Sequence, residues 1–178
     1  STGEAIAEYA TLSAGDKNAV DGLHADTEPL NGDSQLIDRD AMWRSKMHAL
    51  WIIFKAGRTA ERQSVFDQFK ADCGSDLEAY ATWCLCYDKW GAPNGEESNW
   101  ERKFNRNSPE IANLRKQYPD TLDFYRWLEW IAAEQLSSAQ QAAKDAGMHI
   151  GIMSDMAVGV HPSGADVWWN PERFAKGA

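Results

Sequence analysis

The chain has 178 residues, and its 18 Lys and Arg against 27 Asp and Glu give a net charge of -9. An acidic chain repels phosphate backbones and anionic lipid surfaces, so neither nucleic acid nor a membrane is expected as a partner. The longest apolar run, residues 49–54, is far shorter than the roughly 20 residues of a membrane span. An apolar content of 43% with nine tryptophans excludes disorder and predicts a packed core.

A short helix is predicted near the N-terminus, where Ile6, Tyr9 and Leu12 form an apolar pattern. Residues 13–36 are mostly polar and contain glycines, a proline and an Asn-Gly pair. That composition predicts a long linker, and linkers of this length are uncommon inside a compact domain. We therefore assign residues 1–36 to a short helix and a linker that lies across a surface supplied by another part of the protein.

Five helices are predicted between residues 37 and 147, because apolar residues recur there at intervals of three and four. Asp38 and Thr59 are typical N-cap residues, and Ser75 with Glu78 forms a capping box. Pro109 stands at the first position of a helix. The last helix is apolar almost all round in its first half, which predicts burial on several sides. The predicted ranges are 38–57, 59–74, 75–91, 108–119 and 120–147.

The pattern changes after Gly147. Residues 148–155 form a short apolar run directly after a helix end, which predicts a buried strand. A loop with glycine and proline follows at 159–164, and then a short turn or helix. A helix, a glycine and a buried strand make the repeating unit of an α/β barrel or a doubly wound sheet. Because a lone strand needs neighbours and a complete barrel about 250 residues, we expect this chain to be a fragment.

Asp155 is the first candidate for a functional role, because chemistry gathers at the carboxyl ends of strands in both of these folds. It would bind substrate or orient a catalytic group; alternatively, it caps the next loop through backbone N–H groups. His161 lies close by in the sequence, and the alternative for it is a solvated loop histidine. The four histidines show no ligand spacing, and no nucleophile elbow, phosphate-binding loop or dinucleotide fingerprint is present.

The cysteines and tryptophans each allow a functional and a packing interpretation. Cys84 and Cys86 would lie on opposite faces of a helix, so we expect buried free thiols and no metal site. Three cysteines are too few for a disulfide framework, and no secretory signal opens the chain, which together indicate the cytoplasm. Trp100, Trp168 and Trp169 lie in predicted loops, where their faces would either stack on sugar rings or fill a contact with another surface.

The stretch Gly151–Val160, GIMSDMAVGV, followed by SGADVW at 163–168, resembles the 4-alpha-glucanotransferases. These enzymes, also called amylomaltases or disproportionating enzymes, form glycoside hydrolase family 77. A barrel strand of the form D-[ML]-[AP]-[VI]-x-V is characteristic of them, followed by a loop of small residues ending in [DE]-x-W. The segments 155–160 and 166–168 match this pattern in type, order and spacing. Similarities in helices before this strand extend the resemblance to about residues 36–175.

The resemblance implies a cytoplasmic enzyme that moves α-1,4-glucan segments between maltodextrins by a retaining double displacement, with no cofactor or metal. It implies a (β/α)8 barrel in which residues 37–147 form a helical insertion subdomain. Residues 148–178 would then be a barrel strand and the following loop on the active-site side. Four residues are taken as substrate-binding or site-supporting: Asp155, Asp166 and Trp168, which lie in the matched motif, and His161, which lies near Asp155 in the sequence.

The family's nucleophile, acid/base and transition-state-stabilising carboxylates all lie C-terminal to this strand. The resemblance therefore implies that the chain contains no catalytic residue and is inactive without the missing remainder of the barrel. The expected fold is mainly α, with one or two short barrel-type strands near the C-terminus. Two alternatives stay open: a non-enzymatic helical interaction module, and a small carbohydrate-binding unit that uses Trp168 and Trp169.

Overall fold

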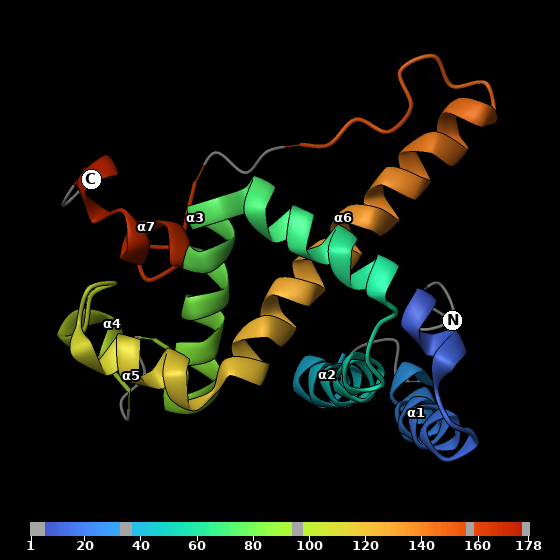
Figure 1. The fold of residues 1–178 in the computed structure, drawn as a ribbon, viewed down its shortest axis with the longest axis horizontal. Helices are drawn as coiled ribbons and strands as arrows, with labels where there is room; N and C mark the ends of the chain where they lie inside the picture. The colour runs from blue at the N-terminus through green and yellow to red at the C-terminus, as the bar shows by residue number, and fades with distance from the viewer. Residues whose placement is uncertain (1–5, 33–36, 94–97, 156–158, 176–178) are drawn as a thin grey trace. The chain divides into compact units, whose positions relative to one another are not determined.

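The computed structural model describes residues 6–32, 37–93, 98–155 and 159–175, and all regular structure in these ranges is helical (Figure 1). The expected mainly α fold is confirmed. The chain divides into two compact units, Ser1–Val65 and Phe66–Ala178. Among the described helices, none has the length and apolarity needed to cross a membrane. The elements are η1 (Ala7–Thr11), α1 (Ala14–Thr27), η2 (Glu28–Gly32), α2 (Arg39–Lys55), α3 (Ala60–Trp90), α4 (Trp100–Lys103), α5 (Pro109–Gln117), α6 (Pro119–Asp145), α7 (Ala165–Trp169) and η3 (Pro171–Arg173).

The first unit contains a helix where the sequence predicted a linker. The Ser13 side chain caps α1, because its Oγ accepts a hydrogen bond from the Asp16 backbone N–H at 3.1 Å. α1 packs against α2, and Ser45 Oγ donates to the Leu23 carbonyl at 2.8 Å. The linker prediction is wrong over residues 14–27, since this cap and this packing outweigh the two glycines that weaken the helix.

A buried ion pair fastens the predicted short N-terminal helix, which forms as the 3-10 helix η1. The Glu8 side chain is only 2% exposed, and its Oε1 lies 3.2 Å from Arg62 Nη2. Arg62 Nε donates to the same oxygen at 3.2 Å. Ile6 and Leu12 are buried at the two ends of η1. The two arms of one guanidinium thus hold η1 to the beginning of α3.

Two of the predicted N-caps are confirmed. Asp38 Oδ1 accepts a hydrogen bond from the Ala41 N–H at 2.9 Å at the start of α2. Thr59 Oγ1 accepts one from the Arg62 N–H at 3.3 Å at the start of α3. Each side chain satisfies a backbone donor that has no partner within its own helix.

α3 joins two of the predicted helices through a bend at Gly74. The backbone there has φ +52° and ψ -127°, a conformation that any side chain would strain. The predicted boundary between residues 74 and 75 therefore appears as a bend in one helix. As predicted, the helix stops before Gly91, where φ is +86°.

The core of the second unit is mostly aromatic. Trp127 on α6 is fully buried, and Phe66 on α3 stacks against Trp130 with ring centroids 5.2 Å apart. This confirms the predicted burial of the first half of the last helix. The buried residues of that helix are Leu122, Phe124, Trp127, Trp130 and Ile131.

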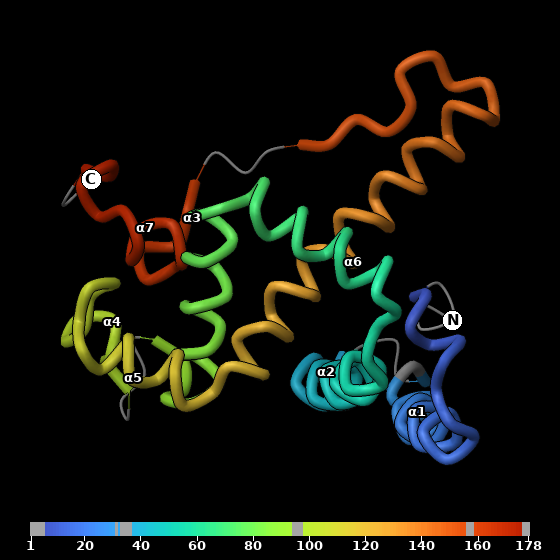
Figure 2. The backbone as a smooth tube through the Cα atoms, in the orientation of Figure 1, coloured from blue at the N-terminus to red at the C-terminus, as the bar shows by residue number. Residues whose placement is uncertain are grey.

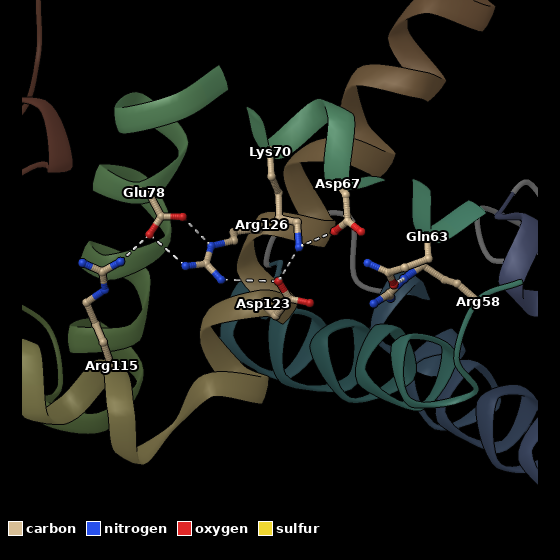
Figure 3. Close-up of polar contacts among 8 residues, drawn as sticks. All are labelled: Arg58, Gln63, Asp67, Lys70, Glu78, Arg115, Asp123 and Arg126. Atoms are coloured by element: carbon tan, nitrogen blue, oxygen red, sulfur yellow. Dashed lines mark hydrogen bonds and ion pairs between the residues drawn. The ribbon is translucent and has the colours of Figure 1, made fainter. Parts of the chain in front are cut away.

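A row of charged side chains crosses the second unit and connects α3, α5 and α6 (Figure 3). Arg126 Nε lies 2.7 Å from Glu78 Oε1, and Arg115 binds the other oxygen of Glu78. Arg126 Nη1 also approaches Asp123 Oδ1 at 3.4 Å, and Lys70 Nζ lies 3.5 Å from the same oxygen. Glu78, which the sequence assigned to a capping box, therefore holds one arginine from α5 and one from α6.

Replacing Glu78 by glutamine is expected to lower the free energy of unfolding by about 1–2 kcal/mol, because a neutral amide leaves two guanidinium groups facing each other. Urea unfolding measures this loss, and high salt should shrink it because salt screens both attraction and repulsion. Asp67→Asn is the matched control, since Asp67 is 56% exposed and its pair with Lys70 is worth about 0.5 kcal/mol or less. Equal losses in the two variants would contradict the role of Glu78.

Residues 148–155 form no strand, and no strand occurs anywhere in the described ranges. Gly147 ends α6 as predicted, with φ +94°, and the Met148 N–H donates to the Ala143 carbonyl at 3.1 Å. Residues 148–155 then run on without a helix after α6 (Figure 2), and Ile150 is 76% exposed and Met153 83%. The predicted buried strand is absent here, because a strand forms only when a neighbouring strand satisfies its backbone groups.

Candidate functional site

The four candidate residues lie between Asp155 and Trp168. Asp155, His161 and Asp166 have exposed side chains, whereas Trp168 is 7% exposed. Across the described residues, no hydrogen bond or ion pair links these four side chains to one another. Residues 156–158, the middle of the matched strand motif, lie outside the described ranges. The structure therefore places the candidates on one stretch of chain without joining them into a charge network.

His161 shapes the turn that leads into α7. Its Nδ1 accepts a hydrogen bond from the Ser163 N–H at 3.1 Å, and its carbonyl accepts one from the Gly164 N–H at 2.8 Å. The Ser163 carbonyl in turn accepts a hydrogen bond from Trp83 Nε1 on α3 at 3.0 Å. The imidazole thus orders a turn that is fixed to the helical core.

Trp168 anchors α7 in that core. Its ring meets Trp100 edge-on, with centroids 5.4 Å apart and an interplanar angle of 81°, and its Nε1 donates to the Phe104 carbonyl at 2.8 Å. Trp100 is 3% exposed and lies on the short helix α4, where the sequence predicted a loop. These contacts support the packing interpretation of both tryptophans. A site-supporting role for Trp168 is compatible with this packing and stays a prediction.

Arg106 is a residue that the sequence analysis did not single out. Its Nη1 donates to the Trp169 carbonyl at 2.8 Å and to Asn170 Oδ1 at 2.9 Å. The guanidinium lies 5.9 Å from the centroid of the Trp169 ring. Arg106 thereby fixes the end of α7 to the segment between α4 and α5. No local pattern announces a contact between residues so far apart in the chain.

A half-buried carboxyl group, Glu129, lies between α6 and α3. Burial raises the pKa of Glu129, and the hydrogen bond from Tyr80 partly offsets this rise in pKa. Burial likewise raises the pKa of Cys84 and that of Cys86, each to about 12. Both thiols therefore stay protonated at neutral pH and are poor nucleophiles. All three cysteines are free, and Cys84 and Cys86 are buried, as predicted.

Glu129→Gln is expected to raise the melting temperature at pH 7. Because the pKa of Glu129 is raised in the folded chain, this group holds its proton more tightly in the folded than in the unfolded chain. The stability of the folded chain therefore falls as the pH rises from the unfolded-state pKa to the folded-state pKa. Glutamine removes the cost of burying a charge and still accepts the Tyr80 hydrogen bond. The gain should vanish below the ordinary glutamate pKa of 4.5. Thermal unfolding from pH 3 to 8 measures it.

The matched variant for this test is Tyr80→Phe, which removes the hydrogen bond that favours the ionised form. It should lose more stability at pH 7 than at low pH. A destabilised Glu129→Gln at pH 7 would mean that the carboxylate has a favourable ionic partner instead.

Among the described residues, no three His, Cys, Asp or Glu side chains are grouped so that they could hold a metal ion. The model of glycoside hydrolase family 77, described as 4-alpha-glucanotransferase, matches residues 7–178. The chain belongs to the 4-alpha-glucanotransferase family. The match includes η1 and α1, which the resemblance in the sequence did not reach.

Individual 4-alpha-glucanotransferases show the same relationship. The chain is 35% identical over 175 residues to the enzymes named 4-alpha-glucanotransferase from Mycobacterium bovis and Mycobacterium tuberculosis, which covers 98% of the chain and 24% of each relative. A 4-alpha-glucanotransferase of Haemophilus influenzae is 25% identical over 159 residues, covering 82% of the chain and 23% of the relative. The chain thus spans about a quarter of the length of these curated relatives.

Proposed function

We propose that this chain is part of a 4-alpha-glucanotransferase that transfers α-1,4-glucan segments between maltodextrins by a retaining double displacement. The family match over residues 7–178, with 98% of the chain aligned to the Mycobacterium relatives, carries this proposal. In that enzyme, residues 37–147 are a helical insertion subdomain. Residues 148–178 supply one strand of a (β/α)8 barrel and a loop on its active-site side.

The exposed apolar residues of the 148–155 segment support its role as a barrel strand. Met148 is 52% exposed, Ile150 76% and Met153 83%. A barrel strand is covered on both faces, so these side chains are of the type that the remainder of a barrel would bury. The remainder of the barrel is therefore the first partner of this segment.

Asp155 stands at the end of this strand in the proposed enzyme and supports the site. An ionised carboxylate at a barrel mouth accepts hydrogen bonds from sugar hydroxyls or orients a catalytic group. Asp166 is exposed in the first turn of α7, which Trp168 and Arg106 hold in place. We place this segment beside the glucan chain in the enzyme. His161 would order its turn, Trp168 would anchor it and Asp166 would face the substrate.

The reaction needs two carboxyl groups close together, one as nucleophile and one as acid and base. We place both outside this chain, and no cofactor or metal takes part. A cytoplasmic location is compatible with the three free cysteines. The 178-residue chain is therefore proposed to lack transferase activity by itself.

The test compares this chain with a longer protein that contains it and has the length of the relatives. With maltotriose as substrate, the longer protein should release glucose and form longer maltodextrins, and the 178-residue chain should form neither. Asp155→Asn in the longer protein should lower kcat/KM. Transfer by the 178-residue chain would overturn the assignment of the reacting carboxylates. An inactive longer protein that is folded would overturn the enzyme proposal.

A small carbohydrate-binding unit is the less favoured function. It needs open aromatic faces, whereas Trp168 is buried against Trp100. Quenching of tryptophan fluorescence by maltodextrin in this chain, abolished by a Trp168→Ala change that leaves the fold intact, would favour it.

A further inference from the structure

The side chain of Gln140 on α6 holds the open segment that follows this helix. Its Nε2 donates to the Ile150 carbonyl at 3.0 Å, and its Oε1 accepts a hydrogen bond from the Ile152 N–H. One amide group thus satisfies two backbone groups that flank Gly151. The next residues along the chain lead directly to Asp155.

These two hydrogen bonds have the pattern of a parallel β-ladder. In such a ladder, one residue of the neighbouring strand donates to the carbonyl before a given residue and accepts from the N–H after it. Gln140 makes both bonds around Gly151 with a single side chain. The strands of a (β/α)8 barrel are parallel, so Gln140 occupies the two groups that a neighbouring barrel strand would use.

The backbone at Gly151 shows that the segment is not in a strand conformation. The φ angle of Gly151 is +83°, whereas residues in parallel strands have φ of about -120°. A Cβ atom on residue 151 would lie 2.6 Å from Nε2 and from Oε1 of Gln140. The close approach of the amide and the positive φ both depend on glycine at this position.

We propose that the Gln140 side chain makes the hydrogen bonds that the neighbouring barrel strand makes in the complete enzyme. Pairing of residues 148–155 with that strand then displaces the Gln140 side chain. This inference rests on the proposed function, since it takes the segment to be a barrel strand. In the exchange, Gly151 passes from positive to negative φ, and the ladder takes over the hydrogen bonds of Ile150 and Ile152. Burial of the exposed apolar side chains Met148, Ile150 and Met153 drives it.

The first experiment follows hydrogen exchange at the Ile152 amide in the 178-residue chain and in the longer protein. In the 178-residue chain, Gln140→Ala should speed this exchange about fivefold, the effect of losing one net hydrogen bond. In the longer protein the same change should leave the exchange unaltered, because the neighbouring strand protects the amide. Equal acceleration in both proteins would overturn the proposal.

The second experiment compares Gly→Ala changes at two glycines for which the proposal predicts different melting temperatures of the longer protein. Gly151→Ala should speed Ile152 exchange in the 178-residue chain and leave the melting temperature of the longer protein unchanged, since alanine is acceptable in a strand. Gly147→Ala is the matched control, because Gly147 has φ +94° with open space around it and ends α6 in both proteins. It should lower the melting temperature of both. A loss in the longer protein as large for Gly151→Ala as for Gly147→Ala would overturn the proposal.

These readouts separate the inference from the proposed function. Hydrogen exchange and melting temperature require no turnover, so a longer protein without transferase activity would defeat the proposed reaction while the comparison of variants still decides the role of Gln140.

Discussion

Trp168→Ala is expected to lower the free energy of unfolding by about 3–5 kcal/mol, the usual cost of removing a buried tryptophan. The indole is 7% exposed, packs against Trp100 and donates a hydrogen bond to the Phe104 carbonyl. Its loss would open a cavity in the aromatic core and leave that carbonyl without this donor. Urea unfolding followed by circular dichroism measures the change.

Trp43→Ala is the matched control for Trp168→Ala. Trp43 lies on α2 and is 59% exposed, so its replacement should change stability by about 0.5 kcal/mol or less. Trp168→Phe should fall between the two variants, since it keeps part of the apolar area and loses the Nε1 hydrogen bond. A stable Trp168→Ala chain would contradict the anchoring role of this residue.

Glu8→Ala is expected to lower the free energy of unfolding by about 3 kcal/mol, because breaking a buried ion pair leaves a charge that burial has desolvated. The Glu8 carboxylate is 2% exposed and receives hydrogen bonds from Nε and Nη2 of Arg62. Arg62 is 24% exposed, so water compensates part of its loss and keeps the effect at the low end of the usual range.

Chemical unfolding of the Glu8→Ala chain tests this expectation. Asp21→Ala on the exposed side of α1 serves as the control and should change stability by about 0.5 kcal/mol or less. The double variant Glu8→Gln with Arg62→Met should be more stable than Glu8→Ala, because it removes both charges together. A double variant less stable than Glu8→Ala would mean that the pair does not carry the effect.

Most helix ends that carry a local signal were predicted correctly, although the capping box at Ser75 and Glu78 predicted a helix start where α3 continues through a bend. Asp38, Thr59 and Pro109 act within one helical turn of their own position, and Gly91 and Gly147 act through their own φ angles. Such signals need no knowledge of the rest of the chain, which is why the boundaries of α2, α3, α5 and α6 follow the sequence closely.

Elements that depend on distant partners were not predictable in this way. α1 carries little apolar patterning of its own and is stabilised against α2, so it was taken for a linker. The sequence pattern of residues 148–155 predicts a strand, but a strand forms only when a neighbouring strand pairs with it. Propensity therefore missed one helix and predicted one strand that did not form. In both cases the outcome depends on a non-local partner, which is present for α1 and absent among the described residues for 148–155.

The candidate site shows the same division. The motif identified the family through the type and spacing of Asp155, Asp166 and Trp168. It could not show that Trp168 is buried, because the residues that bury it lie more than 60 positions earlier in the chain. Arg106 was overlooked for the same reason.

The segment that carries His161 and Asp166 is attached by long-range hydrogen bonds that share one pattern. The donors are side chains, those of Trp83, Trp168 and Arg106, whereas the acceptors at 163, 104 and 169 are main-chain carbonyls. Every amino acid supplies such a carbonyl, so these bonds put no demand on the side chains at the three acceptor positions. The hydrogen bonds themselves therefore depend on the donor side chains. Packing constrains the acceptor positions instead, since Ser163 is 6% exposed and the centroid of the Phe104 ring lies 5.4 Å from that of the Trp90 ring.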